Sequence, residues 1–277
     1  MNISIYYFSG TGSTWWVVQQ FKSIAEKRNH RVILTNIEHV AKIEGNIDEI
    51  DVLGFAYPIY GSDIPQIMKE FLDRFNSNVT VRVRIPVLVL TSMLYFSGDG
   101  ALLPRKYLDK NMFKVLWSKN ISLTSNISIP FFRVNAVSQE KLDKRMEKAK
   151  IALVKLIEDI ELGKPRLRIQ WGIFGWFLSW IQRIFERGMG FMIRFSADSE
   201  RCIKCLKCVK ECPTENIHYD KISEKILYGN NCTWCMRCYN RCPTQAVLVR
   251  GKYCDPERYV RLKSFSKDFE IILPNRL

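Results

Sequence analysis

The stretches CIKCLKCVKECP (residues 202–213) and CTWCMRCYNRCP (residues 232–243) hold eight of the nine cysteines of this 277-residue chain. In both, two residues separate each of the first three cysteines, and a fourth cysteine precedes a proline. Two C-x2-C pairs can also build one tetrahedral zinc site. Zinc needs four ligands, however, and the repeat supplies two triplets and two Cys-Pro pairs. The spacing therefore favours two iron–sulfur clusters over structural zinc.

The repeat resembles the cysteine motifs of bacterial-type ferredoxins that hold two [4Fe-4S] clusters. In those ferredoxins the fourth cysteine of each motif ligates the other cluster. The resemblance therefore implies two crossed ligand sets. One set consists of Cys202, Cys205, Cys208 and Cys242, and the other of Cys232, Cys235, Cys238 and Cys212.

The flanks of the two motifs agree with an internal repeat. We expect a helix to start at each fourth cysteine, and PTENI (213–217) and PTQAV (243–247) to continue into a short helical turn and an apolar strand. Residues 217–229 predict two strands joined by a turn. Cys254 lies outside the pattern and is interpreted as a buried thiol with no assigned role. The motifs depart from the ferredoxin pattern where a small residue or glycine is common, at Lys204, Leu206, Trp234 and Met236.

An unusually aromatic segment lies upstream of the motifs. Gly163-Lys164-Pro165 ends a predicted helix and marks a domain boundary, and WGIFGWFLSWIQRIFERGMGFMIRF follows at residues 171–195. Its mostly apolar opening, residues 171–181, is too short to span a bilayer. The favoured interpretation is a pair of short helices that pack the two domains together, because aromatic stripes at helical spacing are usually buried. The alternative is an interfacial helix whose arginines meet anionic lipid.

Residues 1–160 alternate between strand and helix patterns. Apolar runs of strand character occupy residues 2–8, 31–36, 51–56, 85–92 and 113–123, and helical periodicity covers the segments up to residue 28, 63–76 and 139–161. Such alternation predicts right-handed βαβ units. We therefore expect an α/β domain with a doubly wound parallel sheet of five strands and helices on both faces.

A loop rich in glycine and hydroxyl groups follows the first strand and leads directly into a helix. It consists of Ser9, Gly10, Thr11, Gly12, Ser13 and Thr14. Backbone N–H groups, four hydroxyls and the positive helix N-terminus converge there, so the loop suits a phosphate. No lysine follows as in a Walker A motif, and Trp15 stands where a dinucleotide fingerprint has its third glycine. The alternative is an ordinary tight turn between strand and helix.

The N-terminal part resembles flavodoxins, whose phosphate loop is closely matched by SGTGST, with Ser13 where asparagine is frequent. The resemblance implies a flavodoxin-like fold that binds FMN, with its phosphate on residues 9–14 and its ring between two later strand-end loops. The implied ring contacts are Tyr57, Pro58, Tyr60 and Gly61 in one loop, and Ser92, Met93, Tyr95 and Gly98 in the other. Tyr60 and Tyr95 are predicted to cover the ring faces.

The N-terminal sequence, the cysteine content and the net charge indicate where the protein is located and what it binds. The N-terminus has no basic region before a long apolar run, so we expect no secretory signal and a cytoplasmic protein. Nine cysteines in such a protein argue for metal or redox chemistry rather than disulfides. The formal net charge of +14 predicts a redox partner protein with an acidic docking surface. Nucleic acid is not an expected partner, because the basic residues are scattered along the chain.

These patterns predict three segments in the chain. They are a flavodoxin-like FMN-binding domain at 1–162, an aromatic helical linker at 163–196, and an α+β ferredoxin-like domain with a C-terminal tail at 197–277. The combination resembles the fused flavodoxin–ferredoxin proteins of anaerobes, the EFR family ferrodoxins. The resemblance implies electron transfer between an external carrier, two [4Fe-4S] clusters and FMN, which couples one-electron and two-electron chemistry. The alternative is a flavin-dependent reductase of a small-molecule acceptor. The flavin-facing loops contain no histidine as proton donor, which favours the carrier.

Overall fold

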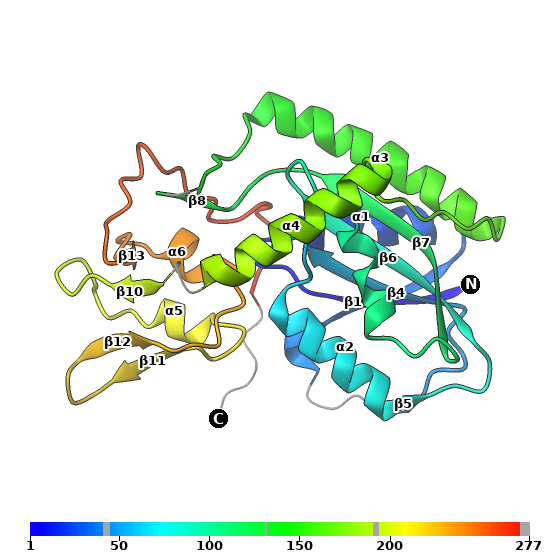
Figure 1. Cartoon of the computed structure of the whole chain (residues 1–277), viewed down its shortest axis with the longest axis horizontal. Coiled ribbons are helices and arrows are strands. Elements are labelled where there is room, and N and C mark those ends of the chain that lie inside the picture. The colour runs from blue at the N-terminus through cyan, green and yellow to red at the C-terminus, as the bar shows by residue number, and fades with distance from the viewer. Residues whose placement is uncertain (41–44, 131, 191–193, 272–277) are drawn as a thin grey trace.

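Five parallel strands form the central sheet of the N-terminal half in the computed structural model (Figure 1), which describes all residues except 41–44, 131, 191–193 and 272–277. In spatial order the strands are β2 (Arg31–Asn36), β1 (Asn2–Tyr7), β4 (Val52–Pro58), β6 (Ile85–Met93) and β7 (Phe113–Ser122). All neighbouring pairs are parallel. Counted along the chain this is the order 2-1-3-4-5 of flavodoxin-like sheets, so the predicted fold class is confirmed.

Helices cover both faces of this sheet (Figure 1). On one face, α1 (Ser13–Glu26) packs against α3 (Gln139–Glu161), and both bury apolar residues in a common core. On the other face, α2 (Gln66–Asn78) and the short helix η2 (Gly100–Lys106) contribute to a second core. The inner strands β4 and β6 are buried along nearly their whole length, because both sides of each strand face a core.

Short elements complete the N-terminal half and connect it to the rest of the chain. They are η1 (Ile37–His39), β3 (Gly45–Asn46) paired with β5 (Val79–Thr80), and β8 (Ser128–Ile129) paired with β9 (Phe132–Arg133). β8 packs against the C-terminal half, where Ile129 and Tyr239 belong to one apolar cluster. The Tyr239 hydroxyl also donates a 2.9 Å hydrogen bond to the Ser128 carbonyl oxygen. The two halves are therefore joined by packed contacts.

The C-terminal half is a small α+β unit with an internal repeat. β10 (Phe195–Ala197) pairs with β13 (Val247–Val249), and β11 (Ile217–Asp220) pairs with β12 (Lys225–Tyr228), both antiparallel. The short helices α5 (Lys207–Lys210) and α6 (Arg237–Arg241) lie inside the two cysteine motifs. The expected helix start at each fourth cysteine is therefore wrong. Each helix ends before that cysteine, because a residue that precedes proline disfavours helical conformation.

The four departures from the ferredoxin pattern share one backbone conformation. Lys204, Leu206, Trp234 and Met236 have φ between 52 and 63°, in the left-handed region. A side chain there costs on the order of 1 kcal/mol relative to glycine, which explains why glycine is common at these positions. The two motifs thus repeat each other in backbone conformation as well as in cysteine spacing.

The aromatic segment forms one helix, α4 (Gly172–Gly190), so the predicted pair of short helices is wrong. Its glycines lie near its two ends, at positions 172, 175, 188 and 190, and no proline interrupts the middle. The middle therefore has no residue that would break it in two. Among the described residues, no helix combines the length and apolar character needed to span a bilayer.

Polar contacts attach α4 to the N-terminal half. The Ser179 hydroxyl donates a 2.7 Å hydrogen bond to Asp99, and Arg183 pairs with the same carboxylate at 2.6 Å. The Arg183 guanidinium also donates to the Ser62 carbonyl oxygen at 2.9 Å. Gly98 permits this close packing, since a Cβ there would lie 2.5 Å from the Ser179 Cβ. The polar side of α4 therefore faces the protein.

Replacing Arg183 with methionine is expected to loosen α4 selectively. The change leaves the mostly buried Asp99 carboxylate without its charged partner, which we expect to cost about 2–3 kcal/mol after a discount for partial exposure. Amide hydrogen exchange in α4 should accelerate by roughly 30- to 160-fold, while exchange in the central strands stays unchanged. Arg105→Met, at an exposed position on η2, is the matched control. Equal exchange in the two variants would contradict this role of Arg183.

Candidate functional site

A cavity of about 240 Å³ lies where the carboxyl ends of the central strands meet the C-terminal half. Most of the predicted flavin contacts line this cavity. They come from the loop of residues 9–14, which we call the first loop, and from both strand-end loops. These residues are Ser9, Gly10, Thr11, Ser13, Thr14, Pro58, Tyr60, Gly61, Ser92 and Met93. The strands are parallel, so their carboxyl ends bring these separate loops to one edge of the sheet. The cavity thus occupies the position at which flavodoxin-like sheets bind ligands.

The first loop has the form of an anion site. The Ser9 hydroxyl accepts 3.2 Å hydrogen bonds from the backbone N–H groups of Gly12 and Trp15, which holds the loop closed. Gly12 has φ of 102°, which side chains rarely adopt. No side chain of the described residues caps the N-terminus of α1, and no acidic residue lies in its first turn. The positive end of the helix is therefore available to a phosphate.

Hydroxyl groups continue along the cavity wall. The hydroxyls of Thr14 and Ser92 are 2.8 Å apart and join the first loop to the end of β6. The Tyr60 hydroxyl is buried beside the Asn126 side chain, and within the described part of the chain it makes no hydrogen bond of standard geometry. Burial also raises the pKa of Tyr60 well above its usual value. A buried hydroxyl beside a cavity can bind a polar ligand atom, so these residues fit a phosphate-bearing cofactor with a polar ring.

Four of the predicted flavin contacts lie outside the cavity lining. Gly12 shapes the loop and is covered by Phe269. The buried Tyr57 side chain points into the core, where its hydroxyl donates a 2.9 Å hydrogen bond to the Gly100 carbonyl oxygen. Tyr95 is 58% exposed and packs under the Arg145 guanidinium. Gly98 contacts α4 instead.

Half of the cavity lining was not among the predicted contacts, although Ile59 and Leu94 lie in the two predicted ring loops, 57–61 and 91–98. The additional residues are Ile59, Leu94, Thr124, Ser125, Asn126, Ile127, Val134, Gln182, Trp234 and Met236. Residues 124–127 follow the predicted fifth strand, so the strand-end rule could have found them. Trp234 and Met236 come from the second cysteine motif, and no local signal indicates that this motif faces the first loop.

Two further cavities lie within the C-terminal half. One is lined by Cys202, Cys205, Cys208 and Cys242, and the other by Cys212, Cys232, Cys235 and Cys238. Cys238 also borders the first of these cavities. The structure thus brings together the two crossed sets that the ferredoxin resemblance implies. Among the described residues, no three His, Cys, Asp or Glu side chains converge on a point that would hold a single metal ion.

The two cysteine cavities differ in exposure. Cys205 in the first is exposed, whereas Cys235 in the second is buried against the first loop. Burial raises the pKa of Cys208 and Cys232 to about 11 and that of Cys235 to about 12. Metal ligands must be thiolates, so loading these sites releases protons. The ninth cysteine, Cys254, is buried in the apolar cluster that includes Tyr239.

The second cysteine motif contacts the first loop directly. A Cβ on Gly10 would lie 2.6 Å from the Cys235 carbonyl oxygen, so only glycine permits this approach. The Asn126 amide bridges the two parts, donating to the Thr11 hydroxyl at 3.1 Å and to the Cys235 carbonyl oxygen at 3.3 Å. The second cysteine cavity and the cavity at the sheet edge are therefore immediate neighbours.

Arg237, between Cys235 and Cys238 in sequence, secures this contact. Its side chain is 2% exposed and forms a bidentate ion pair with Glu38 at 2.6 Å. It also donates to the backbone carbonyl oxygens of Ser9 at 2.7 Å, Gly10 at 2.8 Å and Glu211 at 3.2 Å. Burial lowers the pKa of Arg237, but the Glu38 carboxylate outweighs this effect, so the pKa is raised overall.

Comparisons with known proteins address the two halves separately. Residues 201–247 match a family model described as a 4Fe-4S dicluster domain. A flavodoxin from the domain Archaea is 14% identical, with 58% of this chain and 99% of that chain covered and a TM-score of 0.40. Flavodoxin 1 from Bacillus cereus is 12% identical, with 56% and 98% covered and a TM-score of 0.36. Flavodoxin from Megasphaera elsdenii is 16% identical, with 54% and 98% covered and a TM-score of 0.35. No curated protein matches significantly. The chain thus joins a flavodoxin-like fold, shown by its strand order, to a segment that matches a 4Fe-4S dicluster domain, a combination that supports redox function.

Proposed function

We propose that the protein transfers electrons between an external carrier, two [4Fe-4S] clusters and FMN. This proposal rests on the wall that the second cysteine cavity shares with the cavity at the sheet edge. Trp234 and Met236 line the latter, and each is adjacent in sequence to Cys235. When bound, a [4Fe-4S] cluster exchanges single electrons and FMN exchanges one or two, so their proximity would couple the two kinds of chemistry.

The residues around the sheet-edge cavity fit FMN in particular. Ser9, Gly12 and the N-terminus of α1 would hold the phosphate, and Tyr60 would contact the ring. The cavity lies at the β1–β4 crossover, where the strand order reverses and flavodoxin-like folds bind FMN. This arrangement also supports membership of the fused flavodoxin–ferredoxin family, which we include in the proposal.

The first cysteine cavity is suited to receive electrons from outside. Cys205 is exposed there, beside the exposed residues Lys204 and Lys210 of the same motif, although Lys204 pairs with Glu224. The formal net charge of +14 would attract an acidic carrier and speed their encounter at low ionic strength. The buried second cavity, beside Gly10, would then lie between this entry point and FMN.

The composition of the sheet-edge cavity favours a carrier over a reductase of small molecules. Among the described residues that line it, none is Asp, Glu, His, Lys or Arg. Tyr60 is its only titratable oxygen group, and burial raises the pKa of that hydroxyl. Reduction of an organic substrate usually needs a positioned proton donor, and a tyrosine with a raised pKa is a weak acid.

An anaerobic reductive titration tests the proposal. The protein is reconstituted with iron, sulfide and FMN, and is followed by optical and EPR spectroscopy. We expect about eight iron and eight sulfide per chain, one flavin, and EPR signals of two interacting reduced clusters. Bound zinc without a paramagnetic signal, or failure to retain flavin, would refute the proposal.

A second measurement separates carrier from reductase. The reduced protein is mixed with an acidic electron-carrier protein or with small organic acceptors, and flavin reoxidation is timed. A carrier should be reoxidised rapidly by the acidic protein, at a rate that falls as salt screens the attraction. Faster, saturable reoxidation by an organic acceptor, insensitive to salt, would favour the reductase instead.

A further inference from the structure

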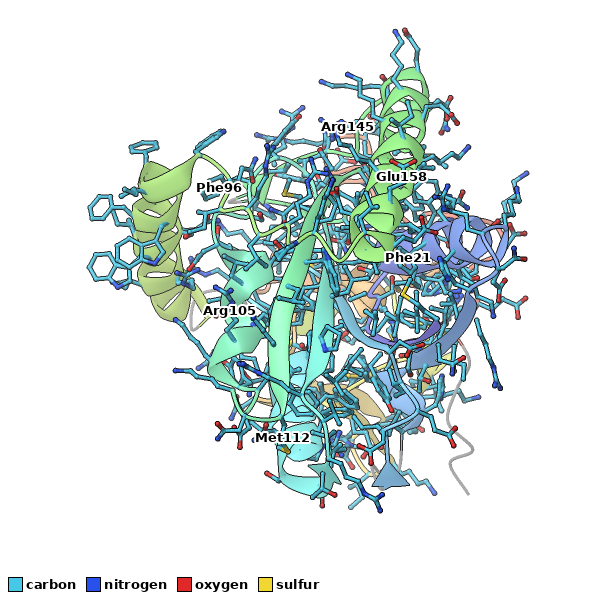
Figure 2. The ribbon with its side chains drawn as sticks, turned by 90° about the vertical axis from the view of Figure 1, so that its right-hand side faces the viewer. Phe21, Phe96, Arg105, Met112, Arg145 and Glu158 are labelled. Carbon is cyan, nitrogen blue, oxygen red and sulfur yellow. The ribbon has the colours of Figure 1, made fainter. Side chains whose placement is uncertain are left out.

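α4 presents a continuous apolar surface to solvent. We call it the aromatic face; it consists of Ile173, Phe174, Trp176, Phe177, Trp180 and Ile184, which are 48–87% exposed. Figure 2 shows the rings of this helix pointing away from the body of the molecule. Single exposed hydrophobic residues are common on soluble domains, but a contiguous patch indicates an interaction site.

The helix cannot easily turn this face inward. Its opposite side makes polar contacts with the body of the protein. Ser179 and Arg183 bind Asp99. The Ser62 hydroxyl donates a 2.8 Å hydrogen bond to Gln182. A surface helix usually places its apolar side on the core and its polar side in solvent. α4 has the reverse orientation, so the aromatic face needs an external apolar environment.

A basic cavity lies at the N-terminal end of α4. It has a volume of about 730 Å³ and is bordered by Lys119, Arg166, Arg168 and Trp171, and the lining residues that the structure describes include no carboxylate. Asp159 outside the lining pairs with Arg166. Burial lowers the pKa of Lys119, and repulsion from Arg166 and Arg168 adds to this effect. An anion in the cavity would relieve the crowding of positive charge.

The surrounding sequence has the composition of a membrane-surface segment. Residues 163–195 contain six lysines or arginines and one glutamate, and three of the seven tryptophans of the chain lie at 171, 176 and 180. Tryptophan favours the boundary between lipid headgroups and acyl chains, and basic residues favour anionic headgroups. The aromatic face and the basic cavity are adjacent along the chain, because Trp171 and Gly172 line the cavity and Ile173 begins the face.

We propose that α4 and the basic cavity dock this protein on an anionic lipid bilayer. The helix would lie in the plane of the interface with its aromatic face among the headgroups, and Lys119 and Arg168 would contact a lipid phosphate. A second copy of the chain suits this surface less well, because symmetric pairing through α4 would bring two basic segments together. This inference is independent of the proposed redox function.

Vesicle flotation of the full-length reconstituted protein tests the proposal. Phosphatidylcholine vesicles with and without phosphatidylglycerol are compared, and tryptophan emission is recorded in parallel. We expect co-flotation and a blue shift of emission with the anionic vesicles, and little of either with pure phosphatidylcholine. Added salt should weaken the binding.

Two variants separate the apolar and basic contributions. W176S/F177S/W180S should bind anionic vesicles about 100-fold more weakly, because three half-exposed aromatic side chains no longer enter the interface. V83S/I151S/I222S removes three exposed apolar side chains elsewhere and is the matched control. K119Q/R168Q should weaken binding by about 30-fold, whereas K114Q/K148Q should change it little. The substituted aromatic side chains are exposed, so thermal unfolding of that variant should match wild type.

Two results would overturn the proposal. One is the absence of binding to anionic vesicles by the wild-type protein. The other is a concentration-dependent dimer that W176S/F177S/W180S abolishes while vesicle binding is unaffected, which would assign the aromatic face to a second copy of the chain.

Discussion

Replacing Arg237 with methionine is expected to lower the free energy of unfolding by about 3–5 kcal/mol. Arg237 uses all five guanidinium N–H groups, two of them on Glu38 and three on backbone carbonyl oxygens. Methionine fills a similar volume but donates no hydrogen bond. The Glu38 carboxylate, whose side chain is 7% exposed, would remain buried without its counter-charge. The large loss follows from this unpaired charge.

Thermal unfolding of the reconstituted protein under anaerobic conditions measures the effect. A loss of this size should lower the unfolding midpoint by roughly 10 °C for a chain of this length. Arg28→Met breaks the exposed ion pair with Glu161 and serves as the control, with an expected loss below about 1 kcal/mol. Similar midpoints for the two variants would show that Arg237 does not hold the halves together.

A double variant tests the assigned cause. R237M/E38M leaves no buried charge unpaired, so it should be more stable than R237M alone. It should remain less stable than wild type, because the carbonyl oxygens of Ser9 and Gly10 still lack their donor. Those two carbonyls belong to the first loop, so retention of FMN should weaken in both variants.

The regular elements were largely predictable from the sequence. The periodicity at 139–161 gives the bounds of α3, and the five apolar runs correspond to the five strands of the main sheet. These patterns are local consequences of burial on one helix face or on both sheet faces. The orientation of α4 was not predictable in this way. Its polar partners, Asp99 and Ser62, lie more than 70 residues away in sequence.

The candidate site was predictable only within each half. Loops at the ends of parallel strands must meet at one edge, so Ser9, Tyr60 and Ser92 could be grouped from their positions alone. The direction of a side chain within a loop was harder to predict. Tyr57 and Tyr95 also lie at the ends of parallel strands, but they do not line the cavity. The wall formed by the second cysteine motif depends on docking between domains, which no local pattern encodes.

Removing two cysteines at a time should reveal which of them share a cluster. The structure places Cys212 and Cys235 at one cavity and Cys205 at the other. The variant C212A/C235A should therefore lose one cluster and retain about four iron atoms per chain, whereas C212A/C205A should lose both clusters. C212A/C235A removes two of the four ligands of one cluster and leaves the other set intact, whereas C212A/C205A removes one ligand from each set.

The opposite pattern is expected if each motif binds its own cluster. C212A/C205A would then retain about four iron atoms, and C212A/C235A would retain none. Iron and sulfide analysis after anaerobic reconstitution distinguishes the two arrangements without any assumption about potentials. The distinction matters for electron transfer. With crossed ligation, Cys212 of the first motif helps to hold the cluster beside Gly10, so both motifs are needed to complete the site nearest the flavin cavity.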